Sequence, residues 1–312
     1  MSKLNFSRIS IYLKAARVPF LTATLVPVLL GSVIAWYKTG LFNWYFFCLV
    51  LLGIAAINIG TNLINDYFDH KSGNDEANLN FTPFSGGSRV IQDGQMSPRN
   101  VSLFAFLSFF LGSIIGLYLN FQLKTNVVLF LGLAGVAMAI FYTATPLKIG
   151  YRGMGEIVVG LCFGPLVVLG SYYVQAKTLG MVPVVSAVPI GILVLLILYI
   201  NEFPDYQADK AVGKNTVVVL LGKARAVYLY QILLILTYSF ILLTVIYKII
   251  PAYCLFSLFT IPLAYKAAKN VSKNFNNTQR LLFSNAATIK LHLIIGIVLS
   301  LGFILDRIAP FL

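Results

Sequence analysis

Residues 42–76 read FNWYFFCLVLLGIAAINIGTNLINDYFDHKSGNDE. Residues 42–65 contain no charged side chain, and about 20 mostly apolar residues suffice for a helix to span a bilayer. Four acids follow at once: Asp66, Asp69, Asp75 and Glu76. Carboxylates at the end of a membrane helix are costly unless they are paired or bound to metal. The stretch therefore predicts a membrane span that ends in a functional site.

The rest of the chain repeats the apolar half of this pattern. Of 312 residues, 59% are hydrophobic and 11% are charged, and the mean hydropathy is +0.86, which is outside the range of soluble globular domains. We expect an all-α, polytopic membrane protein that forms a single domain over residues 1–312. The expected spans number nine: 18–37, 42–65, 101–120, 126–143, 155–175, 181–201, 226–248, 251–268 and 284–305.

The charge distribution sets the expected topology. The net charge is +13, but 18 of the 23 Lys and Arg residues lie on segments at one side of the predicted membrane and five at the other. This is the positive-inside pattern, so the excess charge indicates orientation rather than a nucleic-acid partner. We expect a multi-pass cell-membrane protein whose N-terminus and two long loops, about 66–100 and about 202–225, are cytoplasmic.

A second acidic stretch ends another apolar span. Residues 201–215 read NEFPDYQADKAVGKN and contain Glu202, Asp205 and Asp209. Together the two stretches hold seven of the ten acids in the chain. The spans before them are the second and the sixth, so both run from outside to inside and both acidic stretches reach the same membrane face.

Helical spacing arranges each stretch as a column of oxygen atoms. If the helix of the second span continues through its acidic stretch, one face of that helix carries the first column. One face of the helix of the sixth span carries the second column, although Pro204 could interrupt that helix. The two columns are Asn62, Asn65, Asp66 and Asp69, and Asn201, Asp205 and Asp209. Oxygen ligands with no His or Cys among them favour Mg²⁺, which usually keeps waters and binds substrate phosphates. The two columns therefore predict Mg²⁺ ions that hold a diphosphate.

Cations lie in inside loops near these two stretches. They are Arg89, Lys148, Arg152, Lys210 and Lys214. Positive side chains stabilise the charge that develops on a departing diphosphate. Arg89, Lys148 and Lys214 are the diphosphate-binding candidates.

At these residues the chain resembles the UbiA superfamily of intramembrane aromatic prenyltransferases. The segment that runs from Asn62 through Asp66 and Asp69 to Asp75 is similar to the first Asp-rich motif of that family, and the segment from Asn201 to Thr216 is similar to its second. The GKNT ending and the spacing from Asp69 to Asp75 are closest to the 1,4-dihydroxy-2-naphthoate polyprenyltransferase (MenA) branch.

The resemblance implies a fold, a reaction and a set of site residues. The fold would have nine helices around a central cavity with a cytoplasmic cap and a lateral opening to lipid. The reaction would be Mg²⁺-dependent transfer of a polyprenyl group from its diphosphate to 1,4-dihydroxy-2-naphthoate in menaquinone synthesis. Asp66, Asp69, Asp205 and Asp209 would be catalytic. Tyr142 and Arg17 would line the acceptor pocket, and Asn62 and Asn201 would support the site. The implied metal ligands are Asn65, Asp66, Asp69, Asp75, Asp205 and Asp209.

Three alternatives remain open at the level of sequence. The acceptor could be 4-hydroxybenzoate, homogentisate, a glyceryl phosphate or a chlorin, because all of these would share the metal site. A divalent-cation transporter would need polar groups near mid-membrane with access from both sides. A non-catalytic scaffold would not need two convergent columns. Arg17 could also be a simple positive-inside anchor, and Glu76 and Glu202 receive no role.

Overall fold

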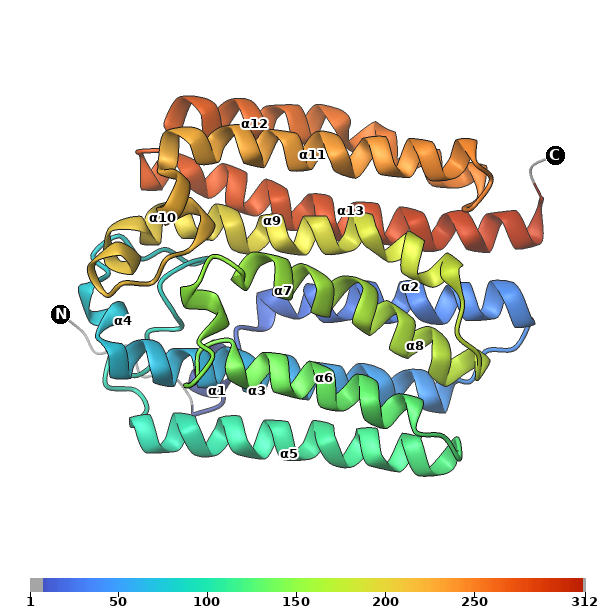
Figure 1. The fold of residues 1–312 in the computed structure, drawn as a ribbon, viewed down its shortest axis with the longest axis horizontal. Helices are drawn as coiled ribbons and strands as arrows, with labels where there is room; N and C mark the ends of the chain where they lie inside the picture. The colour runs from blue at the N-terminus through green and yellow to red at the C-terminus, as the bar shows by residue number, and fades with distance from the viewer. Residues whose placement is uncertain (1–7, 311–312) are drawn as a thin grey trace.

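The computed structural model describes residues 8–310, and these form an antiparallel array of long helices (Figure 1). The N-terminus, which the sequence places inside, lies outside the described residues. The first half of the array consists of α1 (Arg8–Ala15), a 3₁₀ turn (Val18–Leu21), α2 (Thr22–Thr39), α3 (Trp44–Ser72), α4 (Asn74–Ala77), α5 (Pro98–Gln122) and α6 (Val127–Phe141).

The second half continues the same alternation of direction. A π-helical turn (Cys162–Leu166) joins α7 (Gly155–Leu161) to α8 (Val167–Ala176), and a 3₁₀ segment (Ala252–Thr260) precedes α12 (Ile261–Asn274). The helices are α7 (Gly155–Leu161), α8 (Val167–Ala176), α9 (Met181–Ala211), α10 (Val217–Leu221), α11 (Lys223–Ile246), α12 (Ile261–Asn274) and α13 (Thr278–Ile308). The expectation of an all-α fold is confirmed; within residues 8–310 the β-structure amounts to one isolated bridge between Arg152 and Asn215.

Within the described residues, seven segments are long and apolar enough to cross a membrane. They are Val18–Thr39, Trp44–Ser72, Pro98–Gln122, Gly155–Ala176, Met181–Ala211, Lys223–Ile246 and Thr278–Ile308. The other two expected spans differ from an ordinary membrane helix. The fourth is the 15-residue α6, about 22 Å long, and the eighth is the 3₁₀ segment continued by α12, roughly 40 Å together. Nine crossings therefore stay a prediction.

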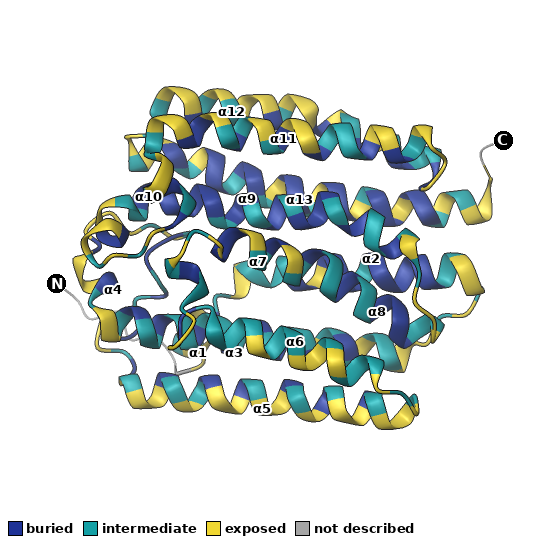
Figure 2. Ribbon diagram, viewed as in Figure 1, coloured by how far each residue is buried: buried dark blue, intermediate teal, exposed yellow. Residues whose placement is uncertain are grey.

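The centre of the array is buried, and its outer helices are not (Figure 2). The main core cluster joins α2, α9 and α13 through side chains such as Leu30, Leu193 and Phe303. In contrast, Phe106 and Phe110 of α5 and Ile235 of α11 are each more than half exposed. Large apolar faces turned outward would favour association in water, but they are the surface that lipid requires.

The ends of two helices position the acidic stretches. The Asn43 side chain accepts from the Phe46 backbone N–H and begins α3, which ends at Gly73 in the left-handed conformation (φ 77°). Both α3 and α9 continue past the predicted ends of their spans, to Ser72 and Ala211. Pro204 does not interrupt α9. The two acidic columns are therefore helical throughout, and both helices end on the side of the molecule that carries α4 and α10 (Figure 1).

Candidate functional site

The two acidic motifs meet at one lysine. Lys214 Nζ lies 3.0 Å from Asp69 Oδ2 and 3.7 Å from Asp209 Oδ1. Asp69 belongs to α3, and Asp209 belongs to α9. Two carboxylates that are far apart in sequence thus share one ammonium group, and this contact joins the two columns.

The segment after α9 fixes this lysine. Gly213 has φ 71°, which turns the chain, and the Lys214 N–H donates to the Asp209 carbonyl at 2.8 Å. The Asn215 N–H then donates to the Tyr151 carbonyl at 3.2 Å. Burial alone would lower the pKa of Lys214, but Asp69 and Asp209 raise it well above its ordinary value. The two carboxylates therefore favour the charged form of the Lys214 side chain.

A tyrosine that the sequence did not single out completes the surroundings of Asp69. The Tyr151 hydroxyl donates to Asp69 Oδ1 at 3.0 Å. Burial, followed by the negative charge of Asp69, raises the pKa of Tyr151 to about 12, so it remains a hydrogen-bond donor. Lys148 Nζ lies 5.3 Å from the centre of the Tyr151 ring, and Lys214 Nζ lies 5.5 Å from it. Lys148 is thus near the site through Tyr151 and is not among the residues that line the cavity.

The loop after α3 crosses to the acids of α9. Asn74 Nδ2 donates to Asp209 Oδ1 at 3.0 Å, and Asn78 Nδ2 donates to Asp205 Oδ1 at 2.7 Å. The Gly86 N–H donates to Asp205 Oδ2 at 3.2 Å. The two asparagine donors were not predicted from the sequence. Only the repeat of Asn after four residues, at positions 74 and 78, offered a signal.

Arg17 reaches the first column from the segment before α2. Its guanidinium forms an ion pair with Asp66, whose other oxygen accepts from the Ser88 N–H at 3.2 Å. Burial alone would lower the pKa of Arg17, but Asp66 and Asp75 raise it. Arg17 lines the cavity. It is therefore more than a surface anchor, and its partner in this structure is a carboxylate of the protein itself.

Asp75 is packed against backbone in the same loop. A Cβ atom on Gly87, which has φ 76°, would lie 2.7 Å from Asp75 Oδ2. The Arg89 guanidinium donates to the Asp75 carbonyl and lies 4.5 Å from the centre of the Phe81 ring. Arg89 does not line the cavity. Burial and the charges of Asp69 and Asp66 raise the pKa of Asp75 to about 8. The positive charges of Arg17 and Lys214 are therefore too small to offset the effects that favour the neutral form of the Asp75 carboxyl group.

The donor set fits a divalent cation in its chemistry. Five carboxyl groups gather here against two partly buried cations, Arg17 and Lys214; the carboxyl groups are those of Asp66, Asp69, Asp75, Asp205 and Asp209. Asn74 Oδ1 is buried without a hydrogen-bond partner. Among residues 8–310, however, no three His, Cys, Asp or Glu side chains converge on one point. Mg²⁺ needs only one or two protein carboxylates when waters and phosphate oxygens supply the rest.

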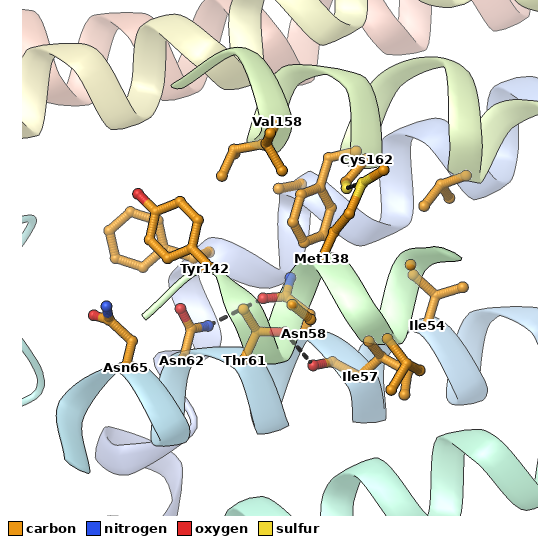
Figure 3. A pocket seen from close by; sticks show the side chains of 18 of the residues that line it. Ile54, Ile57, Asn58, Thr61, Asn62, Asn65, Met138, Tyr142, Val158 and Cys162 are labelled. Carbon is orange, nitrogen blue, oxygen red and sulfur yellow. Dashed lines mark hydrogen bonds between the residues drawn. The ribbon is translucent and has the colours of Figure 1, made fainter. Parts of the chain in front are cut away.

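A cavity of about 460 Å³ extends from this polar group into the helix array. Its polar end includes Asn65, Asp69 and Asp209, and its walls further along are apolar, for example Leu119 and Val128. Figure 3 shows Asn58, Thr61, Asn62 and Asn65 projecting from α3 toward the space beside Tyr142. The shape suits a molecule with a charged head and an apolar tail.

The two predicted supporting asparagines make structural hydrogen bonds. Asn62 Nδ2 donates to Asn58 Oδ1 at 3.0 Å, and Asn58 Nδ2 donates to Thr24 Oγ1 at 2.8 Å, which ties α3 to α2 (Figure 3 shows the first bond). Asn201 Oδ1 accepts from Asn285 Nδ2 of α13 at 2.7 Å. Asn285, which is buried, was not predicted from the sequence.

Comparison with known proteins identifies relatives of the whole chain. The model of the UbiA prenyltransferase family matches residues 24–299. The 1,4-dihydroxy-2-naphthoate octaprenyltransferase of Bacillus subtilis (strain 168) is 29% identical over 92% of this chain and 89% of its own length. The Mycobacterium tuberculosis protein of the same name is 33% identical over 82% of this chain and 84% of its own length. A UbiA homolog from Archaeoglobus fulgidus, solved with DMAPP and Mg²⁺, has the same fold: TM-score 0.61, 16% identity, 93% of this chain and 98% of that one.

Proposed function

The chain belongs to the UbiA prenyltransferase family and is a transferase of the prenyl-transfer type, and from this premise we propose that it transfers a polyprenyl group from its diphosphate to 1,4-dihydroxy-2-naphthoate. The observation that carries the proposal is the contact of Lys214 with both Asp69 and Asp209 at the polar end of a largely apolar cavity. The two relatives with that acceptor in their names support the choice of acceptor.

The site residues would hold Mg²⁺ and the diphosphate together. The ligands for the ion would be drawn from Asn65, Asp66, Asp69, Asp75, Asp205 and Asp209. When bound, Mg²⁺ supplies positive charge to the oxygen atoms of the departing diphosphate. Lys214 would add its own charge to the same oxygens. Arg89 and Lys148 would contribute through the loops that contain them, since neither lines the cavity.

The cavity walls would govern the fate of the prenyl group. Cleavage of the allylic C–O bond leaves positive charge on carbon, and the apolar walls would keep water away from it. The ring of Tyr142, which lines the cavity, could face that charge. The Arg17 guanidinium would bind the carboxylate of the acceptor if that carboxylate displaces Asp66. The aromatic carbon of the acceptor then forms the new C–C bond.

We propose a cell-membrane location with the site on the cytoplasmic face. The support is the excess of Lys and Arg on the segments at the site end, together with the seven apolar helices. A soluble aromatic acceptor could then enter from the cytoplasm, while the polyprenyl tail stays among the apolar walls of the cavity.

The test is a transfer assay with the purified protein in nanodiscs. Radiolabelled geranylgeranyl diphosphate and longer donors are offered with 1,4-dihydroxy-2-naphthoate, 4-hydroxybenzoate, homogentisate, a glyceryl phosphate or a chlorin. We expect product with 1,4-dihydroxy-2-naphthoate, and we expect EDTA to abolish it and Mg²⁺ to restore it. Preferred use of another acceptor would refute this assignment, and turnover in EDTA would refute the metal requirement.

Two acid variants and one control test the site itself. Asp69→Ala and Asp205→Ala should reduce transfer by at least about 100-fold, because each removes a carboxylate at the point where charge develops. Asp93→Ala removes an exposed acid that pairs with Lys14, and it should leave transfer within about twofold. Full activity in either site variant would rule out the proposed metal site.

A further inference from the structure

Two buried glutamates have no part in the proposed diphosphate site. Glu156, in the first turn of α7, is 2% exposed, and Glu202 of α9 is 5% exposed. Buried carboxyl groups are costly unless they are paired or used. Glu202 also lines the cavity. The burial of these two glutamates and the place of Glu202 on the cavity wall require an explanation.

Glu202 lies deeper in the cavity than the acids of the second motif. It precedes Asp205 by three residues and Asp209 by seven on the same continuous helix, so the three share one face. Each α-helical residue advances about 1.5 Å, which places Glu202 roughly 4.5 Å further from the polar end than Asp205. A group bound at that depth would meet the reacting carbon rather than the phosphates.

The two glutamates form a carboxyl pair. The two carboxyl groups lie against each other between α7 and α9, and Oε2 of each is buried without a hydrogen-bond partner among the described residues. Two carboxylates in such contact cannot both be ionised, so the pair holds one proton and one negative charge. One carboxylate of the pair is thus able to accept a further proton.

The surroundings divide the roles of the two residues. Glu156 Oε1 accepts from the Val217 N–H at 2.6 Å, which fixes it between α7 and α10. Glu202 is the member that lines the cavity, near Tyr142. Glu156 is therefore the positioning member, and Glu202 is the member that a bound acceptor would touch.

We propose that Glu202, held by Glu156, binds the ring hydroxyl of the aromatic acceptor and takes its proton as the new C–C bond forms. This inference rests on the proposed prenyl transfer. The O–H bond of the acceptor breaks and its proton moves to Glu202, while the proton that the pair already held ends on Glu156, so that both carboxyl groups become neutral. The O–H electron pair becomes the C=O bond of a ring ketone, and a ring π pair forms the bond to the allylic carbon. The C–O bond of the donor breaks, and its electron pair leaves with the diphosphate.

The first experiment compares Glu202→Gln with the wild type in the transfer assay. The amide keeps the shape but cannot take the proton, so kcat should fall by about 10²–10³-fold, as for loss of a general base. The KM for the polyprenyl diphosphate should stay within about threefold, because the variant leaves the diphosphate site intact. Formate should restore part of the activity of Glu202→Ala, which a purely structural role would not allow. Glu156→Gln should lower kcat less than Glu202→Gln.

Asp93→Asn is the matched control, and it should behave as the wild type in every assay. A Glu202→Gln variant that keeps kcat within about threefold would overturn the inference, as would a slow Glu202→Ala variant that formate does not help. Thermal melting in detergent identifies variants that fail to fold. If Glu202→Gln is one of them, Glu202→Ala with formate decides the matter.

A binding measurement separates this inference from the proposed function. Wild-type protein should bind 1-hydroxy-2-naphthoate at least about tenfold more tightly than 1-methoxy-2-naphthoate, as followed by probe fluorescence, and Glu202→Gln should lose this preference. Absence of transfer in the wild type with the preference retained would refute the proposed function alone. Equal binding of both probes by the wild type would refute the hydroxyl site.

Discussion

At the scale of single residues, Lys214 joins the two motifs, because its ammonium group contacts one acid from each. We predict that Lys214→Met lowers kcat/KM by about 10²–10³-fold, since it removes charge from the leaving group and leaves Asp69 and Asp209 without a cation between them. Initial rates at saturating Mg²⁺ measure the effect.

Lys210 provides the control for this prediction. It lies four residues earlier, is exposed and makes no contact with the cavity. Lys210→Met should change kcat/KM by less than about twofold. Equal losses in the two variants would indicate a general effect of charge at this face instead of the specific contact of Lys214.

Gly87 offers a second test at the same scale. It has φ 76°, and an added Cβ would lie 2.7 Å from Asp75 Oδ2; Gly94 has φ 66° with nothing within 4 Å. Both Gly→Ala changes carry a similar backbone cost of about 1–2 kcal/mol. Only Gly87→Ala should also displace Asp75, and we predict at least a tenfold loss of transfer for it against less than twofold for Gly94→Ala. Comparable rates for the two variants would show that the position of Asp75 is unimportant.

At the scale of elements, α9 contains a proline whose missing donor is replaced from another helix. Pro204 cannot bond the Ile200 carbonyl, and Asn285 Nδ2 of α13 lies 3.4 Å from that oxygen while it donates to Asn201 at 2.7 Å. We predict that Asn285→Leu destabilises the protein by about 1–3 kcal/mol, the cost of unsatisfied buried groups.

A double-mutant cycle isolates the backbone part of that effect. The Pro204→Ala substitution restores a backbone N–H at this position, and that group can bond the Ile200 carbonyl. In this background, Asn285→Leu should therefore cost less than it does in the wild type. Reversible unfolding in mixed micelles gives the four free energies. Strictly additive changes would mean that Asn285 acts on Asn201 alone.

The same elements show how far the sequence alone could predict this molecule. Apolar runs and acid spacing predicted the all-α fold and the facing columns, because both follow from the helical period. The continuity of α9 through Pro204 did not follow, since the side chain that bonds the Ile200 carbonyl belongs to Asn285, 81 residues later in the chain than Pro204. Nor did the contact of Tyr151 with Asp69. A hydrogen bond between distant loops leaves no periodic pattern in the sequence.

Two expected spans illustrate a different limit. Hydropathy over 126–143 and 251–268 predicted full-length helices, but α6 has 15 residues and the later segment begins as a 3₁₀ helix. Apolar composition predicts that a segment is stable in lipid, but it does not predict which helical hydrogen-bond pattern the segment adopts. The family and the reaction type, in contrast, were predicted correctly from the paired motifs.

At the scale of the whole molecule, the cavity joins the charged site to the lipid-facing helices, and its free volume should limit the donor tail. Gly116 of α5 lines the cavity, and an added Cβ there would meet nothing within 4 Å. We predict that Gly116→Phe fills this space and lowers kcat/KM for geranylgeranyl and longer diphosphates at least tenfold, while dimethylallyl diphosphate is used at a rate within about threefold of the wild type.

Ala137→Phe on α6 is the control, because Ala137 is exposed and does not line the cavity. It adds the same ring on a neighbouring helix and should not change the preference for donor length. Rates measured with a series of donors of increasing length distinguish the outcomes. A uniform loss across the series in Gly116→Phe would indicate damage to the charged site, whereas an unchanged series would mean that the tail leaves the cavity before it reaches α5. Only a loss that grows with donor length fits a tail that lies along this wall.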